Sequence, residues 1–311
     1  MAVKMNGNQI KERGVNRLFS LTNGILLFLF MLIELYPLVY VVSASVSDPK
    51  AVTSGTMWLF PVNFNLEGYK YILHYKELWI GYANTIVYTL LGTGFNLLLT
   101  LPAGYAFSRK DFKDSGILMV VFVITMYFGG GLIPSYLNIY SMGLVNTRLI
   151  LIILGGLNVY NMLVARTFFA NSIPWELHEA ATIDGASNSK IFFSIVLPLS
   201  KPIIAVMALY YGVGHWNEYF SAMIYVANDR RKWPLQLFLR EILNQSKWAA
   251  NALLSTDMMT AEEMEVMIKQ AETANVLKYC VIVASTLPML IVYPRLQKFF
   301  NKGVMVGSVK G

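Results

Sequence analysis

The sequence predicts an all-α membrane protein with six transmembrane helices. Of its 311 residues, 56% are hydrophobic and only 14% are charged, and the mean hydropathy is +0.50. A soluble protein of this length needs more polar surface. A helix crosses the hydrocarbon core with about 20 largely apolar residues, and six runs fit that length. They are 18–42, 82–107, 116–137, 147–169, 201–226 and 274–293.

The first run has two interpretations. Lys11, Arg13 and Arg17 precede it, and residues 42–44 resemble a signal-peptide cleavage site. However, its apolar stretch is longer than the roughly 7 to 15 residues of a signal peptide. We therefore expect a retained first span behind a cytoplasmic arm over residues 1–17.

Three consecutive glycines, Gly129, Gly130 and Gly131, lie inside the third run. A glycine-rich phosphate cradle needs a following lysine, and none follows here. In an apolar run, glycine permits close helix contact or a local break. We expect one of these roles.

A polar loop separates the fourth and fifth runs and predicts a helix-turn-helix at the membrane surface. Pro174 suits the first turn of a helix, and Gly185 can adopt the positive φ of a turn. A second helix is expected over 187–196, ended by Pro198, and Pro202 begins the next span. DNA binding is the poorer interpretation, because the loop lacks a basic recognition face. A purely structural hairpin is the other alternative.

The loop carries the most specific motif of the chain. Its residues are Glu179, Ala180, Ala181, Asp184, Gly185, Leu197 and Pro198. This pattern resembles the EAA loop of inner-membrane permease subunits of binding-protein-dependent ABC importers. The resemblance implies a type I ABC importer permease fold, in which this loop is the coupling helix seated in a groove of a separate ATPase.

Further stretches resemble the MalG-like permeases for oligosaccharides, and among them the LplC type. They are 101–109, 128–134, 233–237 and 303–311. The resemblance implies four partners: an ABC ATPase dimer that binds ATP and Mg²⁺, a second homologous permease subunit, an extracytoplasmic solute-binding protein and the lipid bilayer. It implies no cofactor in this chain, and an oligosaccharide substrate that includes uronate sugars such as alginate fragments.

The charge distribution predicts the orientation in the membrane. With the N-terminus inside, the cytoplasmic segments hold 14 Lys and Arg against 6 Asp and Glu, as the positive-inside rule requires. Both ends and the coupling loop, 171–200, are then cytoplasmic. The permease domain covers 18–301, with an extracytoplasmic loop at 228–275 and a tail at 302–311. The net charge of +7 is explained by topology and does not indicate nucleic-acid binding.

Polar residues inside the spans are candidates for the substrate pathway, because they are costly in a bilayer. They are Asn96, Asn158, Asn161, Tyr210, Tyr211, His215, Trp216, Asn217 and Glu218. Aromatic faces beside hydrogen-bonding groups suit sugars. The alternative is that these groups join helices or form an interfacial belt.

The outer loop is expected to contain an amphipathic helix over 234–244 and a second helix opened by the capping box of Thr260 and Glu263. It would dock the binding protein or cap the pathway. The basic residues 230–232 are compatible with an acidic sugar or are a solvated loop.

Two other function classes remain open from the residues alone. An ion-coupled secondary transporter also carries mid-membrane polar groups. A membrane enzyme would have Glu34 and Glu218 as its only intramembrane carboxylate pair. The sequence contains no phosphate loop, no His-Glu-x-x-His helix and no nucleophile elbow. We therefore expect no catalytic or metal site, and Cys280 is expected to be a buried apolar residue.

Overall fold

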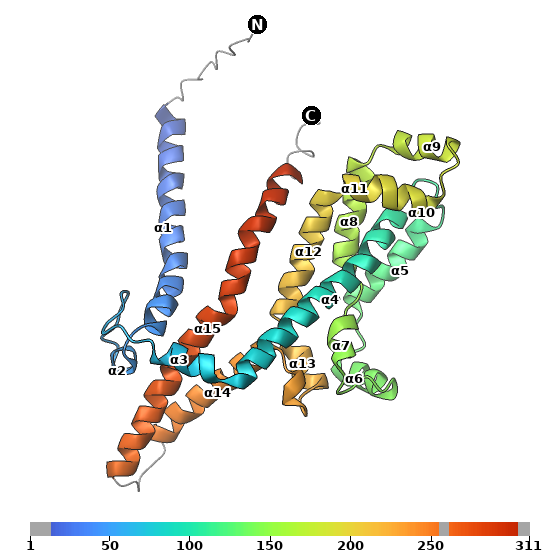
Figure 1. Ribbon diagram of the computed structural model, residues 1–311. Coiled ribbons are helices and arrows are strands. Elements are labelled where there is room, and N and C mark those ends of the chain that lie inside the picture. Colours follow the sequence, from blue (N-terminus) through green and yellow to red (C-terminus); the bar gives the residue numbers. More distant parts are fainter. Residues whose placement is uncertain (1–13, 255–260, 304–311) are drawn as a thin grey trace.

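The computed structural model describes residues 14–254 and 261–303, and within them every regular element is a helix (Figure 1). Most of the expected N-terminal arm and tail, and Thr260, lie outside this part of the chain. The elements are α1 Gly14–Ser45, α2 Pro49–Thr53, α3 Glu67–His74, α4 Lys76–Ser108, α5 Ser115–Tyr127, α6 Leu132–Ser141, α7 Arg148–Ile153, α8 Val159–Ser172, α9 Trp175–Ile183, α10 Asn188–Ile191, the π-helix η1 Phe192–Val196, α11 Leu197–Leu199, α12 Lys201–Trp216, α13 Phe220–Tyr225, the 3₁₀ helix η2 Arg230–Lys232, α14 Leu235–Leu254 and α15 Ala261–Gly303.

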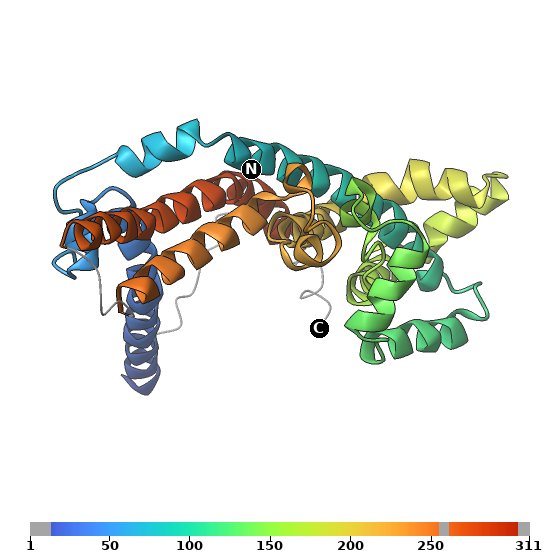
Figure 2. The same ribbon diagram turned by 90° about the horizontal axis from the view of Figure 1, so that it is seen from below.

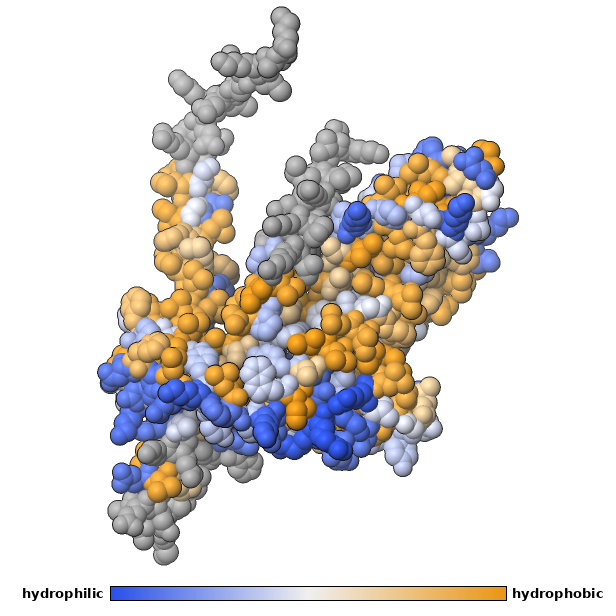
Figure 3. Space-filling model, in the orientation of Figure 1, coloured by the Kyte–Doolittle hydropathy of each residue, from blue (hydrophilic) through white to orange (hydrophobic). Residues whose placement is uncertain are grey.

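Three helices in the described residues are long and apolar enough to cross a bilayer. They are Leu18–Ser45, Lys76–Ser108 and Met264–Pro294. Two bent pairs, Ser115–Tyr127 with Leu132–Ser141 and Asn188–Leu199 with Lys201–Trp216, raise the number to five if each is one span. The face seen in Figure 3 carries a broad apolar region between a polar lower edge and polar groups at the upper end of α9 and α10.

The third apolar run is not one helix. Its two parts, α5 and α6, meet at 110°. Gly131 has a φ of 85° at the start of α6, a conformation that side chains with a Cβ rarely adopt. Of the two roles expected for the three glycines, the structure has the local break.

The fourth and fifth runs are also interrupted. Residues 154–158 separate α7 from α8, and residues 217–219 separate α12 from α13. Gly155 has a φ of 69° in the first gap. At about 1.5 Å per residue, the 14-residue α8 is about 21 Å long and shorter than the hydrocarbon core of about 30 Å. Apolarity located these runs, but it did not predict that each would be divided.

In the loop predicted over 228–275 the helices are longer than predicted, whereas the apolar runs described above are divided. The amphipathic helix predicted over 234–244 is present and extends over α14, Leu235–Leu254. The helix predicted after residue 260 and the sixth apolar run form a single helix, α15, of 43 residues. Figure 2 shows α14 and α15 side by side.

The continuous helix α4 supplies hydrogen bonds to the backbone between α7 and α8. The amide nitrogen of Asn96 donates to the carbonyl oxygens of Gly155 at 3.1 Å and Gly156 at 2.8 Å. These carbonyls lie past the end of α7, where no helical partner is available. A buried side chain of α4 thereby satisfies backbone groups that a membrane interior would leave unpaired.

The first half of α4 pairs backbone groups of the segment before α14 in the same way. Asn84 donates to the carbonyl oxygens of Arg231 at 2.8 Å and Trp233 at 2.9 Å. The hydroxyl of Tyr88 donates to the carbonyl of Lys232 at 2.9 Å. The loop between α13 and α14 is therefore fixed to α4 through its backbone.

Near its inner end, α4 approaches α8 closely at Gly104. A Cβ built there would lie 2.9 Å from Cβ of Ala165 and 3.1 Å from the backbone nitrogen of Arg166. Neither atom belongs to a flexible side chain. Only glycine fits between the two helices at this distance.

We expect Gly104→Ala to destabilise the protein by about 1–3 kcal/mol, because α4 and α8 must separate to admit the methyl group. Thermal unfolding of the purified protein in detergent measures this as a lower Tm. Gly94→Ala on the same helix is the matched control, since nothing lies within 4 Å of its Cβ position. Equal Tm values for the two variants would contradict the close contact.

Candidate functional site

The polar loop forms a helical hairpin at one end of the molecule. Figure 1 shows α9 at the same end as the beginning of α1 and the end of α15. Pro174 is the N-cap of α9, one position before the predicted first turn. Gly185 has a φ of 74°, as predicted. Gly185 N–H donates to Thr182 and Ala186 N–H to Ala181, the pattern of a Schellman motif.

The second half of the hairpin continues further than predicted. The side-chain oxygen of Ser187 accepts from the N–H of Lys190 and caps α10. A π-helical stretch, η1, follows, and its hydrogen bonds span one residue more than those of an α-helix. The helix therefore passes Pro198 and ends at Leu199, where the chain bends by 83° into α12. Pro202 lies in the first turn of α12, as predicted.

The seven residues of the EAA-like motif differ in their exposure to solvent. Ala181 is buried, and Leu197 is partly buried against the same apolar cluster. Glu179, Ala180, Asp184, Gly185 and Pro198 are exposed. Sequence reasoning missed Ile183, whose side chain is 85% exposed next to the turn. The sequence feature that could have identified it is an isoleucine directly before Asp184 and Gly185 in a polar loop.

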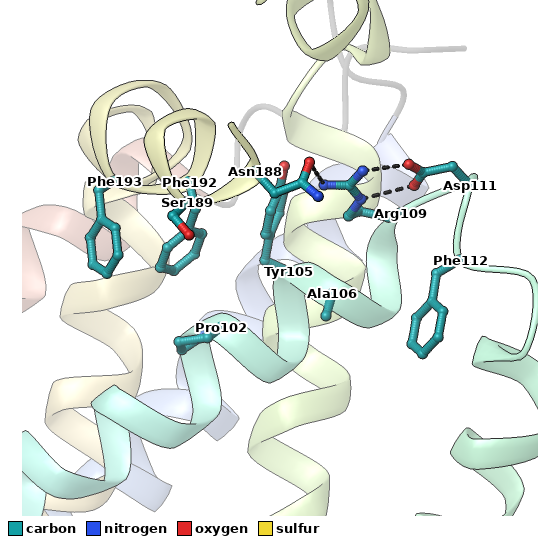
Figure 4. Close-up of a pocket in the computed structure, with 10 residues that line it drawn as sticks. All are labelled: Pro102, Tyr105, Ala106, Arg109, Asp111, Phe112, Asn188, Ser189, Phe192 and Phe193. Atoms are coloured by element: carbon teal, nitrogen blue, oxygen red, sulfur yellow. Dashed lines mark hydrogen bonds and ion pairs between the residues drawn. The ribbon is translucent and has the colours of Figure 1, made fainter. Parts of the chain in front are cut away.

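Arg109 joins the hairpin to the end of α4 (Figure 4). Its guanidinium donates to Asn188 Oδ1 at 2.8 Å and, through Nε, to Asp111 Oδ1 at 2.8 Å. A second bond from Arg109 to Asp111 makes the pair bidentate, the strong form of this interaction. The hydrogen bonds from Arg109 hold the pKa of Asp111 below its usual value. These residues border a cavity of about 520 Å³ between α4 and α10.

His178 packs on the other side of Arg109. Its ring centroid is 4.6 Å from that of Trp175, and its Nδ1 is 3.4 Å from the hydroxyl of Tyr105. Burial, followed by the positive charge of Arg109, lowers the pKa of His178. Both effects favour the neutral imidazole. Neither Arg109 nor His178 was a predicted site residue, because their contacts join segments far apart in the sequence.

Four of the nine pathway candidates, Asn96, Tyr211, His215 and Trp216, join helices in this structure. His215 Nε2 lies 2.7 Å from Asn96 Oδ1. Tyr211 OH lies 2.6 Å from Thr100 Oγ1. The indole nitrogen of Trp216 donates to the carbonyl of Ser285. These contacts hold α12 against α4 and α15.

The remaining candidates lie at helix ends or on an open face. Asn158 caps α8 by accepting from the N–H of Asn161, and Tyr211 OH accepts from Asn158 N–H at 3.3 Å. Asn161 is buried. In contrast, Tyr210 is 47% exposed, and Asn217, seven residues later on the same helical face, is also exposed.

The two intramembrane carboxylates do not form a pair. Glu218 Oε1 accepts from the N–H of Ser221 at 2.7 Å at the beginning of α13. Glu34 lies on α1, which packs against α15. Figure 1 shows α15 between α1 and α12. Among the described residues, no group of three His, Cys, Asp or Glu side chains is placed to hold a metal ion. Cys280 is buried, as predicted.

The chain resembles known transport proteins over most of its length. Residues 78–306 match the family described as the inner membrane component of binding-protein-dependent transport systems. The chain belongs to this family. It is 37% identical to the polygalacturonan/rhamnogalacturonan transport system permease protein YtcP of Bacillus subtilis, covering 95% of this chain and 99% of YtcP. Protein LplC of the same organism is 36% identical, covering 95% of this chain and 96% of LplC.

A solved structure agrees with this assignment. It is the crystal structure of a bacterial ABC transporter involved in the import of the acidic polysaccharide alginate. The TM-score is 0.80 at 32% identity, covering 93% of this chain and 99% of that chain. The all-helical permease fold is therefore confirmed.

The family assignment decides between the function classes. The permease is the non-catalytic inner-membrane component of a binding-protein-dependent ABC importer. An ATPase and a solute-binding protein are thereby implied as partners. The ion-coupled transporter and the membrane enzyme are set aside.

We expect Arg109→Gln to lower ATP-driven uptake several-fold while the permease remains in the membrane, because α10 loses its bond to α4. Uptake by proteoliposomes that contain the whole transporter measures this. Lys113→Gln is the matched control, since Lys113 is an exposed cation of the same inner loop. An Arg109→Gln transporter as active as the control would refute a positioning role.

Proposed function

We propose that the permease crosses the membrane six times, with both ends in the cytoplasm, and passes an acidic oligosaccharide inward by alternating access. The observation that carries this proposal is the exposed helical hairpin at one end of the fold. This hairpin combines an exposed polar tip with a firm attachment to a long helix. Its two halves, α9 and α10, contact the inner end of α4 through His178 and Arg109.

The coupling surface is proposed to be the hairpin of residues 171–200. Its exposed residues Glu179, Ala180, Asp184 and Gly185 would contact the ATPase, with Pro198 at the edge. Ala181 and Leu197 would act from the inside, by fixing the hairpin on the apolar cluster. Because this cluster includes residues of α4 and α12, movement of the hairpin is carried directly into the membrane helices.

We propose four partners for the permease, each placed on a different surface of the fold. An ATPase dimer would bind ATP and Mg²⁺, so this chain needs no cofactor of its own. A second homologous permease would cover the exposed membrane faces, and the bilayer would cover the rest. The binding protein is proposed to dock on the segment 228–275, whose helix α14 lies at the opposite end of the fold from α9 (Figure 1).

The substrate is proposed to be an oligosaccharide that contains uronate units. YtcP is described as a permease for polygalacturonan and rhamnogalacturonan, and the solved transporter imports alginate, an acidic polysaccharide. Both relatives therefore handle sugars that carry carboxylates. Within this chain, Tyr210, Asn217 and Glu218 are the proposed pathway residues, because among the candidates on α12 and in the break after it they are the ones not used to join α12 to α4 or α15.

The test of the proposed function is purification of the chain in mild detergent from its host, with mass spectrometry of the proteins that accompany it. Recovery of an ATPase, a second permease and a binding protein supports the proposal. The complex, reconstituted with its binding protein, should import trigalacturonate only when ATP is present. A chain that purifies alone, with no ATPase, would overturn it.

The turn at Gly185 gives a sharper test of the coupling surface. We expect Gly185→Val to abolish the coupling of ATP hydrolysis to uptake, because a β-branched residue at a φ of 74° costs about 1–3 kcal/mol and distorts the turn. Gly185→Asn is the matched control, since asparagine tolerates this conformation. Uptake per ATP hydrolysed is the measurement. Wild-type values in Gly185→Val, or in Glu179→Lys, would remove this hairpin from the coupling mechanism.

A further inference from the structure

The three basic residues at the start of the segment 228–275 all form ion pairs, and they share two carboxylates, those of Asp229 and Glu241. Arg230 makes a bidentate pair with Glu241, at 2.6 and 2.7 Å. Asp229 accepts from Arg231 at 3.0 Å and lies 3.1 Å from Lys232. These cations fix the fold of the loop and leave little charge to attract an acidic sugar.

Arg240 differs from these three residues because it forms no ion pair with a described residue. It is partly buried on α14, and its guanidinium carbon lies 5.3 Å from the ring centroid of Tyr219, a cation–π contact. It also touches the sulfur of Met223. Within the described residues, no carboxylate lies within ion-pair distance of it. A guanidinium that is partly desolvated and has no counter-charge is ready to bind an external anion.

The surroundings of Arg240 supply further polar groups. Gln236 lies one turn earlier on the same face of α14, and its Nε2 is 3.5 Å from Asn217 Oδ1. Asn217 and Tyr219 belong to the break between α12 and α13. The cluster therefore joins the beginning of α14 to the outer end of α12.

An open stripe on α12 leads away from this cluster. Tyr210, Gly214 and Asn217 follow one another at spacings of four and three residues, so they share a face. Tyr210 and Asn217 are exposed, and nothing lies within 4 Å of a Cβ at Gly214. Such a polar stripe is costly against lipid. It suits a hydrated route for a sugar.

We propose that Arg240, with Gln236, Asn217 and Tyr219, forms a subsite that binds the carboxylate of a uronate unit at the outer mouth of the pathway. The proposal rests on the function and orientation proposed above. The planar guanidinium matches a carboxylate in bidentate geometry, and the ring of Tyr219 offers an apolar face to the sugar. The carboxylate of Glu218 accepts from Ser221 N–H, and no ion pair joins it to Arg240 in the described part of the chain.

The test uses the whole transporter in proteoliposomes with saturating binding protein that carries trigalacturonate. We expect Arg240→Gln to lower the initial uptake rate about tenfold, and Arg240→Lys to retain at least a third of it, because the positive charge remains. Lys76→Gln is the matched control. It removes one exposed cation at the start of α4, outside the proposed docking segment, and no ion pair involves Lys76 among the described residues. This control should transport at the wild-type rate.

The outcomes separate the subsite from the proposed function. Equal loss in Arg240→Gln and Arg240→Lys would show a packing role and overturn the subsite. Wild-type uptake by both variants would also overturn it, with the importer left intact. A wild-type transporter that imports neutral galactooligosaccharides but no trigalacturonate would overturn the subsite and the acidic substrate together. Failure of the wild type to import any oligosaccharide would instead refute the proposed function.

Discussion

The structure depends on one constraint: a chain that interrupts its helices within a membrane must still pair every backbone N–H and C=O group. The helix α4 meets this constraint for its neighbours. Asn96 binds two carbonyls in the gap after α7, and Asn84 binds two more before α14. Thr85 accepts the N–H of Leu235, the first residue of α14. Buried polar side chains that would be expensive alone are therefore required by the breaks beside them.

The same helix connects the two functional ends of the permease. With 33 residues, α4 is about 50 Å long at 1.5 Å per residue. Its first half is bonded to the loop before α14, and its C-terminal end is bonded to the hairpin of residues 171–200 through Arg109. Packed helices have discrete arrangements and do not deform continuously. In the proposed mechanism, a shift of the hairpin would therefore move α4 as a whole and reach the loop before α14.

The sequence predicted the helical class, the apolar runs and the turn at Gly185, because each follows from local composition or from one residue's conformational range. It indicated a local break as one of two roles for the glycines of the third run, and it did not predict the divisions of the fourth and fifth runs, since apolar residues are equally common in bent and straight segments. It also could not identify the partners of polar residues. His215 and Asn96 are 119 positions apart, and only the packing of α12 on α4 brings them together. Arg109 was visible as a basic residue of an inner loop, but its contact with Asn188 depends on the folded hairpin.

The two sides of α12 show why a polar residue in a span is not by itself a pathway residue. One side carries Tyr211 and His215, whose hydrogen-bonding groups are occupied by α4. The other side carries Tyr210 and Asn217, which have no contact with α4 and remain exposed. Tyr211 and His215 can lie inside the membrane because their hydrogen-bond partners belong to the same chain. Asn217 of the second pair bonds to Val213 and Gln236, and the exposed surface of both residues is open to water, a sugar or a second permease. Gly214 lies between Tyr210 and Asn217 on this side, and nothing lies within 4 Å of its Cβ position. A helix that served only to pack against a neighbour would gain van der Waals contacts from a larger side chain there.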